Sequence, residues 1–145
     1  MSLNSDIPQM RHDASGSGEP LVLVPGGFTG WLSWIPHAEA LAVSRRVIRL
    51  QLHNVELGLS GAPLPPTYSV DFEVTALGKT LDDLAIEQAD FAGWSYGTVI
   101  ALSYALHNPH RVQSLTLIEP SAYWVLRSWG PLSRQLLDEH YVSHV

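Results

Sequence analysis

Short apolar runs alternate with amphipathic segments along most of the sequence, and this alternation constrains the fold more than any other feature. Four runs have the length and residue content of strands: 21–24, 46–52, 90–94 and 114–118. Three segments between them show the apolar periodicity of helices: 33–42, 69–84 and 96–107. Strands and helices that alternate in this way form a mainly parallel sheet with helices on both faces. The sequence therefore predicts an α/β fold, a three-layer sandwich.

The boundaries of these elements follow from glycine, proline and capping residues. A weaker strand is expected at 10–14, before a turn at 15–18. Residues 53–68 hold two glycines and three prolines, too many for regular structure, so we expect a loop that ends at Ser69, the N-cap of the next helix. The inward side chains of the last two helices are expected at helical spacing: Val70, Val74, Leu77, Leu81 and Leu84, then Val99, Leu102 and Leu106.

A serine between two glycines stands where the strand at 90–94 gives way to the helix at 96–107, in the motif Gly93-Trp94-Ser95-Tyr96-Gly97. In parallel sheets, reactive groups collect at the carboxyl ends of the strands. A Gly-x-Ser-x-Gly turn exposes a nucleophilic serine there, because the glycines let neighbouring backbone approach closely. The motif therefore predicts Ser95 as a nucleophile. The alternative is a structural turn in which Ser95 only caps the helix.

Attack of a serine on a carbonyl group creates an oxyanion, which a pair of backbone N–H donors must stabilise. One donor would be the N–H of Tyr96, directly after the nucleophile. The other would come from the loop 25–28 that ends the first strand, with Gly27 as the first candidate and Phe28 as the second. The alternative is that Pro-Gly-Gly at 25–27 only terminates the strand.

On these residues the chain resembles the N-terminal half of the α/β-hydrolase fold family, in particular its cytosolic esterase, lipase and peptidase-like members. The resemblance runs from about residue 10 to residue 120. It rests on four stretches: 21–28, the loop with Gly58 and Gly61, 93–97, and 107–120. It implies Ser95 as nucleophile, the N–H groups of Gly27 and Tyr96 as oxyanion hole, and a cap after the last strand. Two residues depart from the family pattern, Pro25 where many members have histidine and Thr98 where a smaller residue is common.

A serine nucleophile also needs a base and an acid, which in this family follow it in the order acid, then histidine. Glu119 is the local candidate for the acid, because it ends the strand beside that of Ser95; alternatively, its carboxylate only steadies the turn into the cap. Four histidines follow the motif, and none is expected beside the serine: His107, His110, His140 and His144. We therefore expect a sheet truncated after Glu119 and a catalytic histidine beyond Val145.

The predicted organisation is an N-terminal part of the core at 1–120 and the start of a helical cap or lid at 121–145. The predicted function is hydrolysis of an ester, thioester or amide bond of a small apolar substrate through an acyl-Ser95 intermediate, with this piece alone inactive. The apolar preference rests on four aromatic residues expected near the site: Phe28, Trp94, Tyr123 and Trp124. The alternatives are perhydrolase, carbon–carbon hydrolase or lyase chemistry on the same fold, or a non-catalytic binding domain.

Composition argues against several other classes of function. The net charge is −6 and the eight basic residues are mostly scattered, so we expect a small-molecule substrate and no nucleic acid or membrane partner. There is no cysteine and no ligand-like histidine spacing, so no metal or other cofactor is expected. Residues 1–20 lack a continuous apolar run, which predicts a cytoplasmic protein without a signal peptide. An unpaired edge at 114–118 would favour self-association.

Overall fold

The structure, a computed structural model, describes residues 7–120. Five strands form one sheet in the order β1-β3-β2-β4-β5. Their bounds are β1 (Arg11–Ser15), β2 (Pro20–Val24), β3 (Arg46–Gln51), β4 (Ala89–Trp94) and β5 (Val112–Ile118). Strands β2 to β5 pair in parallel, whereas β1 runs antiparallel to β3. The expected mainly parallel α/β sheet is confirmed, and so is the weaker strand at its start.

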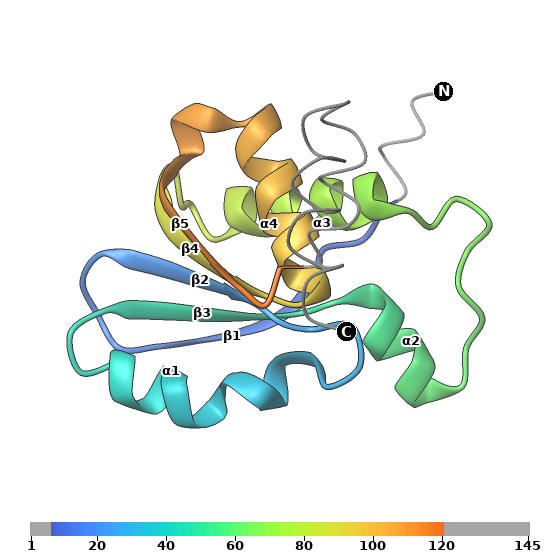
Figure 1. Cartoon of the computed structure of the whole chain (residues 1–145), viewed down its shortest axis with the longest axis horizontal. Coiled ribbons are helices and arrows are strands. Elements are labelled where there is room, and N and C mark those ends of the chain that lie inside the picture. Colours follow the sequence, from blue (N-terminus) through green and yellow to red (C-terminus); the bar gives the residue numbers. More distant parts are fainter. Residues whose placement is uncertain (1–6, 121–145) are drawn as a thin grey trace, which may run out of the picture.

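The helices cover both faces of this sheet. The bounds are η1 (Gly30–Trp34), α1 (Ile35–Leu41), α2 (His53–Ser60), α3 (Val70–Asp83), α4 (Tyr96–His107) and η2 (Pro109–Arg111). Helices α3 and α4 lie on one face and the η1–α1 segment lies on the other (Figure 1). The three-layer sandwich is therefore confirmed.

Two apolar clusters hold the layers together, one on each face of the sheet. Because successive strand residues point to opposite faces, neighbours in one strand enter different clusters. Val22 packs towards α3 and α4 in the larger cluster, while Leu23 packs against Trp34 and Ala38 of the η1–α1 segment in the smaller one. Both β2 residues are fully buried, as expected of a central parallel strand.

The expectation of a loop over 53–68 is wrong in its first half, because residues 53–60 form helix α2. The two glycines lie within α2 and at its end, whereas the prolines follow the helix. Gly58 lies on the exposed side of α2, where an added Cβ would have nothing within 4 Å, so its only cost to the helix is its low helix propensity. Gly61, with φ 70°, is the C-cap, and all three prolines follow it. Only 61–68 is irregular.

Helix α3 begins as expected at its N-cap, because the Ser69 hydroxyl accepts a hydrogen bond from the N–H of Phe72. Its buried face differs in part from the expected stripe. Leu77 and Leu81 are fully buried, but three members are only half-buried: Val70, Val74 and Leu84. Two polar residues, Glu73 and Thr80, take places in the core instead.

The expected inward face of α4 is wrong, since Leu106 is 72% exposed and Val99 and Leu102 are only half-buried. The buried face follows another stripe: Gly97, Ile100, Ala101 and Tyr104. The helix is apolar on most sides, so periodicity alone does not select a face. The rotation of α4 about its own axis is set at Gly97. This residue packs so closely against the end of β2 that a Cβ would lie 2.3 Å from the Val24 carbonyl oxygen.

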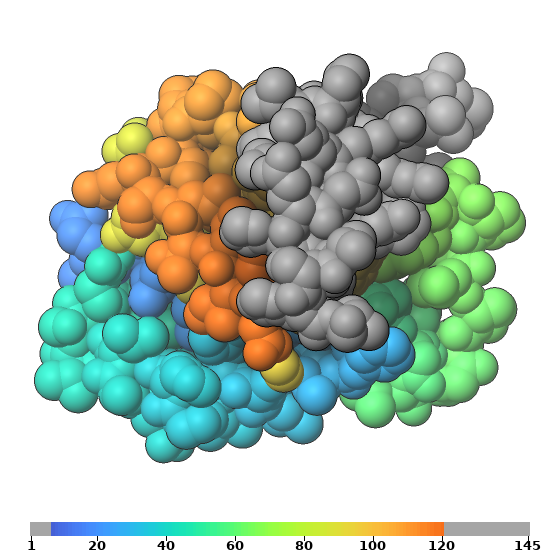
Figure 2. Space-filling view, in the orientation of Figure 1, coloured from blue at the N-terminus to red at the C-terminus, as the bar shows by residue number. Residues whose placement is uncertain are grey.

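Strand β5 forms one edge of the sheet within the described range, where it pairs only with β4. Figure 2 shows β5 and α4 (orange) and the η1–α1 segment (cyan) on the outer surface of the molecule. None of the helices among residues 7–120 is long and apolar enough to cross a membrane.

Candidate active site

Ser95 stands at the turn between β4 and α4 in a conformation that L-residues seldom adopt, with φ 51° and ψ −118°. Such backbone strain costs about 1–3 kcal/mol and persists only where the surroundings enforce it. Here the N–H of Ser95 donates to the carbonyl oxygen of Ile118 at 3.0 Å, which ties the turn to the end of β5. The strained turn is the backbone geometry that lifts a nucleophilic hydroxyl above the sheet.

The two glycines of the motif are required by the closeness of the backbone around Ser95. A Cβ at Gly93 would lie 2.7 Å from the carbonyl oxygen of Gly97. A Cβ at Gly97 would lie 2.3 Å from the carbonyl oxygen of Val24 and 2.5 Å from that of Pro25. Both contacts are with backbone atoms, which leave no room for a side chain.

Thr98 supports the turn. Its N–H and its hydroxyl both donate to the carbonyl oxygen of Ser95, at 2.9 and 2.6 Å. The larger residue does not hold strand and helix apart, because a Cβ at Gly93 would lie 2.9 Å from the Thr98 Cα. Within the described residues the Ser95 side chain makes no capping hydrogen bond, so nothing supports the alternative that this serine serves as an N-cap.

The loop after β2 lies directly against the turn. A Cβ at Gly26 would be 3.7 Å from the Ser95 Cβ, and one at Gly27 would be 3.4 Å from the Tyr96 Cβ. Among residues 7–120, the N–H groups of Gly27, Phe28 and Tyr96 have no hydrogen-bond acceptor. The structure therefore brings together the groups that the sequence nominated for an oxyanion hole, and the choice between Gly27 and Phe28 stays a prediction.

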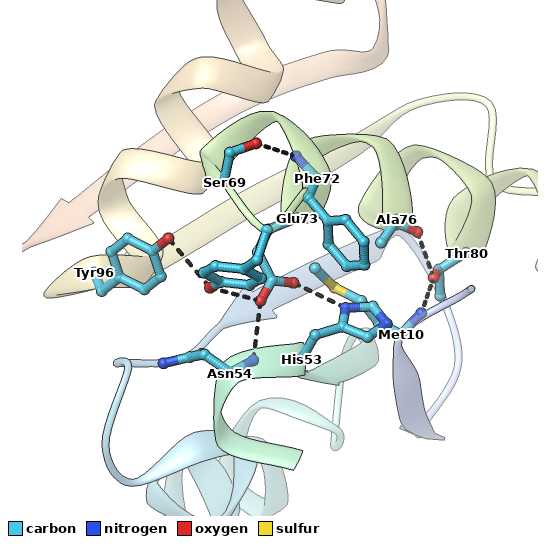
Figure 3. Close-up of polar contacts among 10 residues, drawn as sticks. Met10, His53, Asn54, Ser69, Phe72, Glu73, Ala76, Thr80 and Tyr96 are labelled. Carbon is cyan, nitrogen blue, oxygen red and sulfur yellow. Dashed lines mark hydrogen bonds and ion pairs between the residues drawn. The ribbon is translucent and has the colours of Figure 1, made fainter. Parts of the chain in front are cut away.

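A buried polar network lies beside this loop (Figure 3) and was missed at the level of sequence. Glu73 on α3 is fully buried, and its carboxylate accepts three hydrogen bonds. The donors are the His53 Nδ1 at 3.0 Å, the Asn54 N–H at 3.3 Å and the Tyr68 hydroxyl at 3.0 Å. The Tyr68 hydroxyl also lies 3.3 Å from that of Tyr96, the residue after Ser95.

The spacing of Glu73 along its helix is the sequence feature that indicates its burial. A glutamate near the start of a helix interacts favourably with the helix dipole whether or not it is buried, so the charge of Glu73 does not indicate its burial. Its spacing to later buried residues of α3 is helical, at three, four, seven and eight positions: Ala76, Leu77, Thr80 and Leu81. A glutamate on the apolar stripe of a helix is a candidate for a buried, hydrogen-bonded carboxylate.

His53 also lines an apolar cleft of about 580 Å³. Its walls come from the start of α3, from α2 and from the proline-rich loop that follows α2: Phe72, Leu57, Pro63, Leu64, Pro65 and Pro66 are among the lining residues. His53 begins α2 directly after β3, so the cleft is at the carboxyl edge of the sheet, where Ser95 also lies.

Glu119 directly follows β5, next to the serine turn, with φ 49°. Its carboxylate accepts a hydrogen bond from the Trp94 indole N–H at 2.9 Å and is exposed. The structure thus gives Glu119 a partner that steadies the strand end. Its role as the catalytic acid stays a prediction.

The aromatic and histidine candidates differ in their distance from the serine turn and in their exposure. The Phe28 side chain is fully exposed, whereas Trp94 packs against the smaller core cluster and lines a cavity of about 170 Å³. His107 and His110 are exposed at the far end of α4, opposite the serine turn. Four candidates lie outside the described residues: Tyr123, Trp124, His140 and His144. Within residues 7–120 no three acidic or histidine side chains form a group that could hold a metal ion.

A strained serine turn between a strand and a helix, on a mainly parallel sheet, is typical of the α/β-hydrolase fold. A family model described as alpha/beta hydrolase fold matches residues 19–138, and the chain belongs to this family. It is 41% identical over 110 residues to the 2-hydroxymuconate semialdehyde hydrolase of a Pseudomonas species, an alignment covering 74% of this chain and 38% of that protein.

Two further comparisons agree on the family. The chain is 36% identical over 121 residues to the 2-hydroxy-6-oxo-2,4-heptadienoate hydrolase of Pseudomonas putida, covering 81% of this chain and 43% of that protein. Its fold matches the solved structure of a meta-cleavage product hydrolase from Pseudomonas fluorescens with a TM-score of 0.62 and 26% identity, covering 73% of this chain and 39% of that one. The chain spans about 40% of the length of each of these three proteins.

Proposed function

We propose that the intact protein is a serine hydrolase that cleaves an ester, thioester or amide bond of a small apolar molecule through an acyl-Ser95 intermediate. The observation behind the proposal is the backbone of Ser95, held at φ 51° between β4 and α4 by neighbours that leave no space for any side chain at Gly93 or Gly97. Strain of this kind is characteristic of a nucleophile turn.

In the proposed reaction the Ser95 Oγ attacks the carbonyl carbon of the substrate and a histidine base takes its proton. The carbonyl oxygen becomes an oxyanion and is stabilised by the N–H of Tyr96 together with that of Gly27 or Phe28. When the intermediate collapses, the leaving group departs with the proton that the base returns. Water then attacks the acyl-enzyme by the same route, which frees Ser95 and releases the acid product.

Two features support a small apolar substrate. The cleft beside His53 is lined mainly by proline, leucine and phenylalanine side chains. The exposed Phe28 side chain stands on the loop that faces the serine turn. The proposed partner is accordingly a small molecule, without nucleic acid or membrane.

The first experiment is labelling of the intact protein, expressed from its complete reading frame, with a fluorophosphonate probe. We expect one labelled site in the wild type and none in Ser95→Ala. Ser60→Ala is the matched control, because it removes an exposed hydroxyl from α2 and should leave labelling unchanged. An unlabelled wild-type protein, or equal labelling of Ser95→Ala, would contradict the proposal.

A second candidate function is suggested by the two relatives named above, which are a semialdehyde hydrolase and an oxo-dienoate hydrolase. It keeps Ser95 as the reactive residue and changes the bond that is cleaved, to a carbon–carbon bond. A panel of p-nitrophenyl esters beside the two substrates in those relatives' names separates the candidates. Turnover of only the latter would favour the second one.

A further inference from the structure

The Glu73 carboxylate is linked by hydrogen-bonded neighbours to the two segments that carry the proposed oxyanion donors. One segment is the loop after β2, with Gly27 and Phe28. The other is the start of α4 at Tyr96. Glu73 makes no hydrogen bond to either segment itself, but hydrogen bonds through Asn54 and Tyr68 lead from it to both. Figure 3 shows the contact with the Asn54 N–H and the contacts that lead to Tyr96.

The first connection runs through Asn54. Its N–H donates to Glu73, and its side-chain amide donates to the carbonyl oxygen of Gly27 at 2.9 Å. The Asn54 Oδ1 is buried and has no partner among the described residues, so the contact with Gly27 is what orients this amide. Because the chain has no cis peptide among these residues, a fixed Gly27 carbonyl also fixes the direction of the Phe28 N–H.

The second connection runs through Tyr68. Its hydroxyl donates to Glu73 at 3.0 Å and therefore accepts the hydrogen bond from the hydroxyl of Tyr96, at 3.3 Å. Burial, helped by the hydrogen bond with Tyr96 and the negative charge of Glu73, raises the pKa of Tyr68 well above its ordinary value. Tyr68 thus keeps its proton at any working pH and remains a donor.

Burying a carboxylate away from solvent is costly unless hydrogen-bond donors surround it, so Glu73 carries a desolvation penalty that its donors must offset. Three donors satisfy it, from His53, Asn54 and Tyr68. We propose that Glu73 is a positioning residue that holds both walls of the oxyanion hole, the Gly27 loop through Asn54 and Tyr96 through Tyr68. This proposal rests on the proposed function, because it assigns a task to the same site.

The test uses the intact protein and measures the rate of fluorophosphonate labelling over a range of probe concentrations. Glu73→Gln keeps the shape of the side chain and removes the charge that orders the three donors. We expect the limiting rate of labelling to fall about 10- to 100-fold, less than the roughly 100- to 1000-fold cost of removing an oxyanion donor itself, because Glu73 acts on the donors indirectly. The half-saturating probe concentration should change less than about threefold. Tyr68→Phe breaks one connection and should give a smaller loss.

Thr80→Val is the matched control. Thr80 is also fully buried and hydrogen-bonded on α3, to the Ala76 carbonyl and the Met10 N–H, but it has no contact with this network. We expect it to lower the thermal midpoint while the limiting labelling rate stays within about twofold of wild type. In the double variant Glu73→Gln with Tyr68→Phe the loss should match that of Glu73→Gln alone, because both changes act through one network.

The outcomes separate this proposal from the one on which it rests. Wild-type labelling that is lost in Ser95→Ala but kept at full rate in Glu73→Gln overturns the positioning role alone. Equal losses in Glu73→Gln and Thr80→Val would also overturn it, since any buried polar change would then have the same effect. Labelling that survives Ser95→Ala overturns the proposed function itself.

Discussion

Gly97 is the residue that allows the serine turn to pack closely against the end of β2. The Cβ of an alanine there would meet two backbone oxygens, at 2.3 and 2.5 Å, and neither can move without displacing the end of β2. We therefore expect Gly97→Ala to lower the free energy of unfolding by about 1–3 kcal/mol, a typical cost of overpacking, and to abolish labelling of Ser95. Urea unfolding followed by circular dichroism measures the first effect.

Gly58→Ala is the control for that experiment. Gly58 is also a helical glycine, but nothing lies within 4 Å of the added Cβ. Alanine should therefore raise the free energy of unfolding by about 0.5–1 kcal/mol through helix propensity and the unfolded state. If Gly97→Ala behaved like Gly58→Ala, the close approach of α4 to β2 would be refuted.

Residues differ in how far their place in the site follows from sequence. The glycines around Ser95 follow from the motif, because its chemistry demands a tight strand-to-helix turn. Glu73 does not, since a glutamate in the first turn of a helix has an equally good solvent-exposed explanation. Its burial depends on Tyr68, Asn54 and His53, which meet it only when α2 and α3 are packed together.

Asp90 ties three elements at the amino edge of the sheet. It lies on β4, accepts a hydrogen bond from Ser114 on β5, and pairs with Arg45 just before β3. The Ser114 hydroxyl, and with it the Arg45 guanidinium, outweighs the effect of burial and lowers the pKa of Asp90 below its ordinary value. A lowered folded pKa means that Asp90 stabilises the fold above its unfolded pKa, about 3.9, and that this stabilisation is lost at more acidic pH.

We expect Asp90→Asn to reduce the free energy of unfolding at pH 7 by about 1 kcal/mol, the upper end of the range for exposed ion pairs, because the Asp90 and Arg45 side chains are only 17% and 28% exposed. The variant should also lose stability less steeply than wild type as the pH falls below about 4. Chemical denaturation at a series of pH values measures both effects. Glu39→Gln, which changes an exposed carboxylate on α1, should leave the slope unchanged; an unchanged slope in Asp90→Asn as well would contradict the assignment.

At the scale of elements, strands were easier to predict than helix faces. A short, continuous apolar run is typical of a strand that is buried on both faces of a parallel sheet. The positions of the strands therefore followed almost directly from these runs. Helix α2 was not predicted, because Gly58, Gly61 and the three prolines together indicated a loop, although the prolines all lie beyond the end of the helix. The face of α4 could not be predicted from an evenly apolar segment, because the contact of Gly97 with β2 decides it.

The sheet as a whole ends in two edge strands within the described residues, the antiparallel β1 and the parallel β5. Strand β5 pairs with β4 only, so the hydrogen-bonding groups of its other edge have no partner strand within residues 7–120. Exposed apolar side chains stand at both ends of this strand, with Leu106, near the end of α4 that leads into β5, 72% exposed and Ile118, the last residue of β5, 40% exposed. An open strand edge beside exposed apolar residues is a template for pairing with a second copy.

We therefore expect the 145-residue chain, expressed by itself, to self-associate through β5 in a concentration-dependent way, measured by sedimentation velocity. Thr116→Lys places a charge at an exposed position of β5 and should shift the distribution towards monomer, because a buried lysine at a strand–strand interface is costly. Ser17→Lys adds the same charge at an exposed position in the turn between β1 and β2 and should leave association unchanged. A chain that stays monomeric and unfolds in a single two-state transition contradicts this expectation, since the edge would then be protected without a partner. If both lysine variants dissociate the assembly equally, net charge and not the β5 edge governs association.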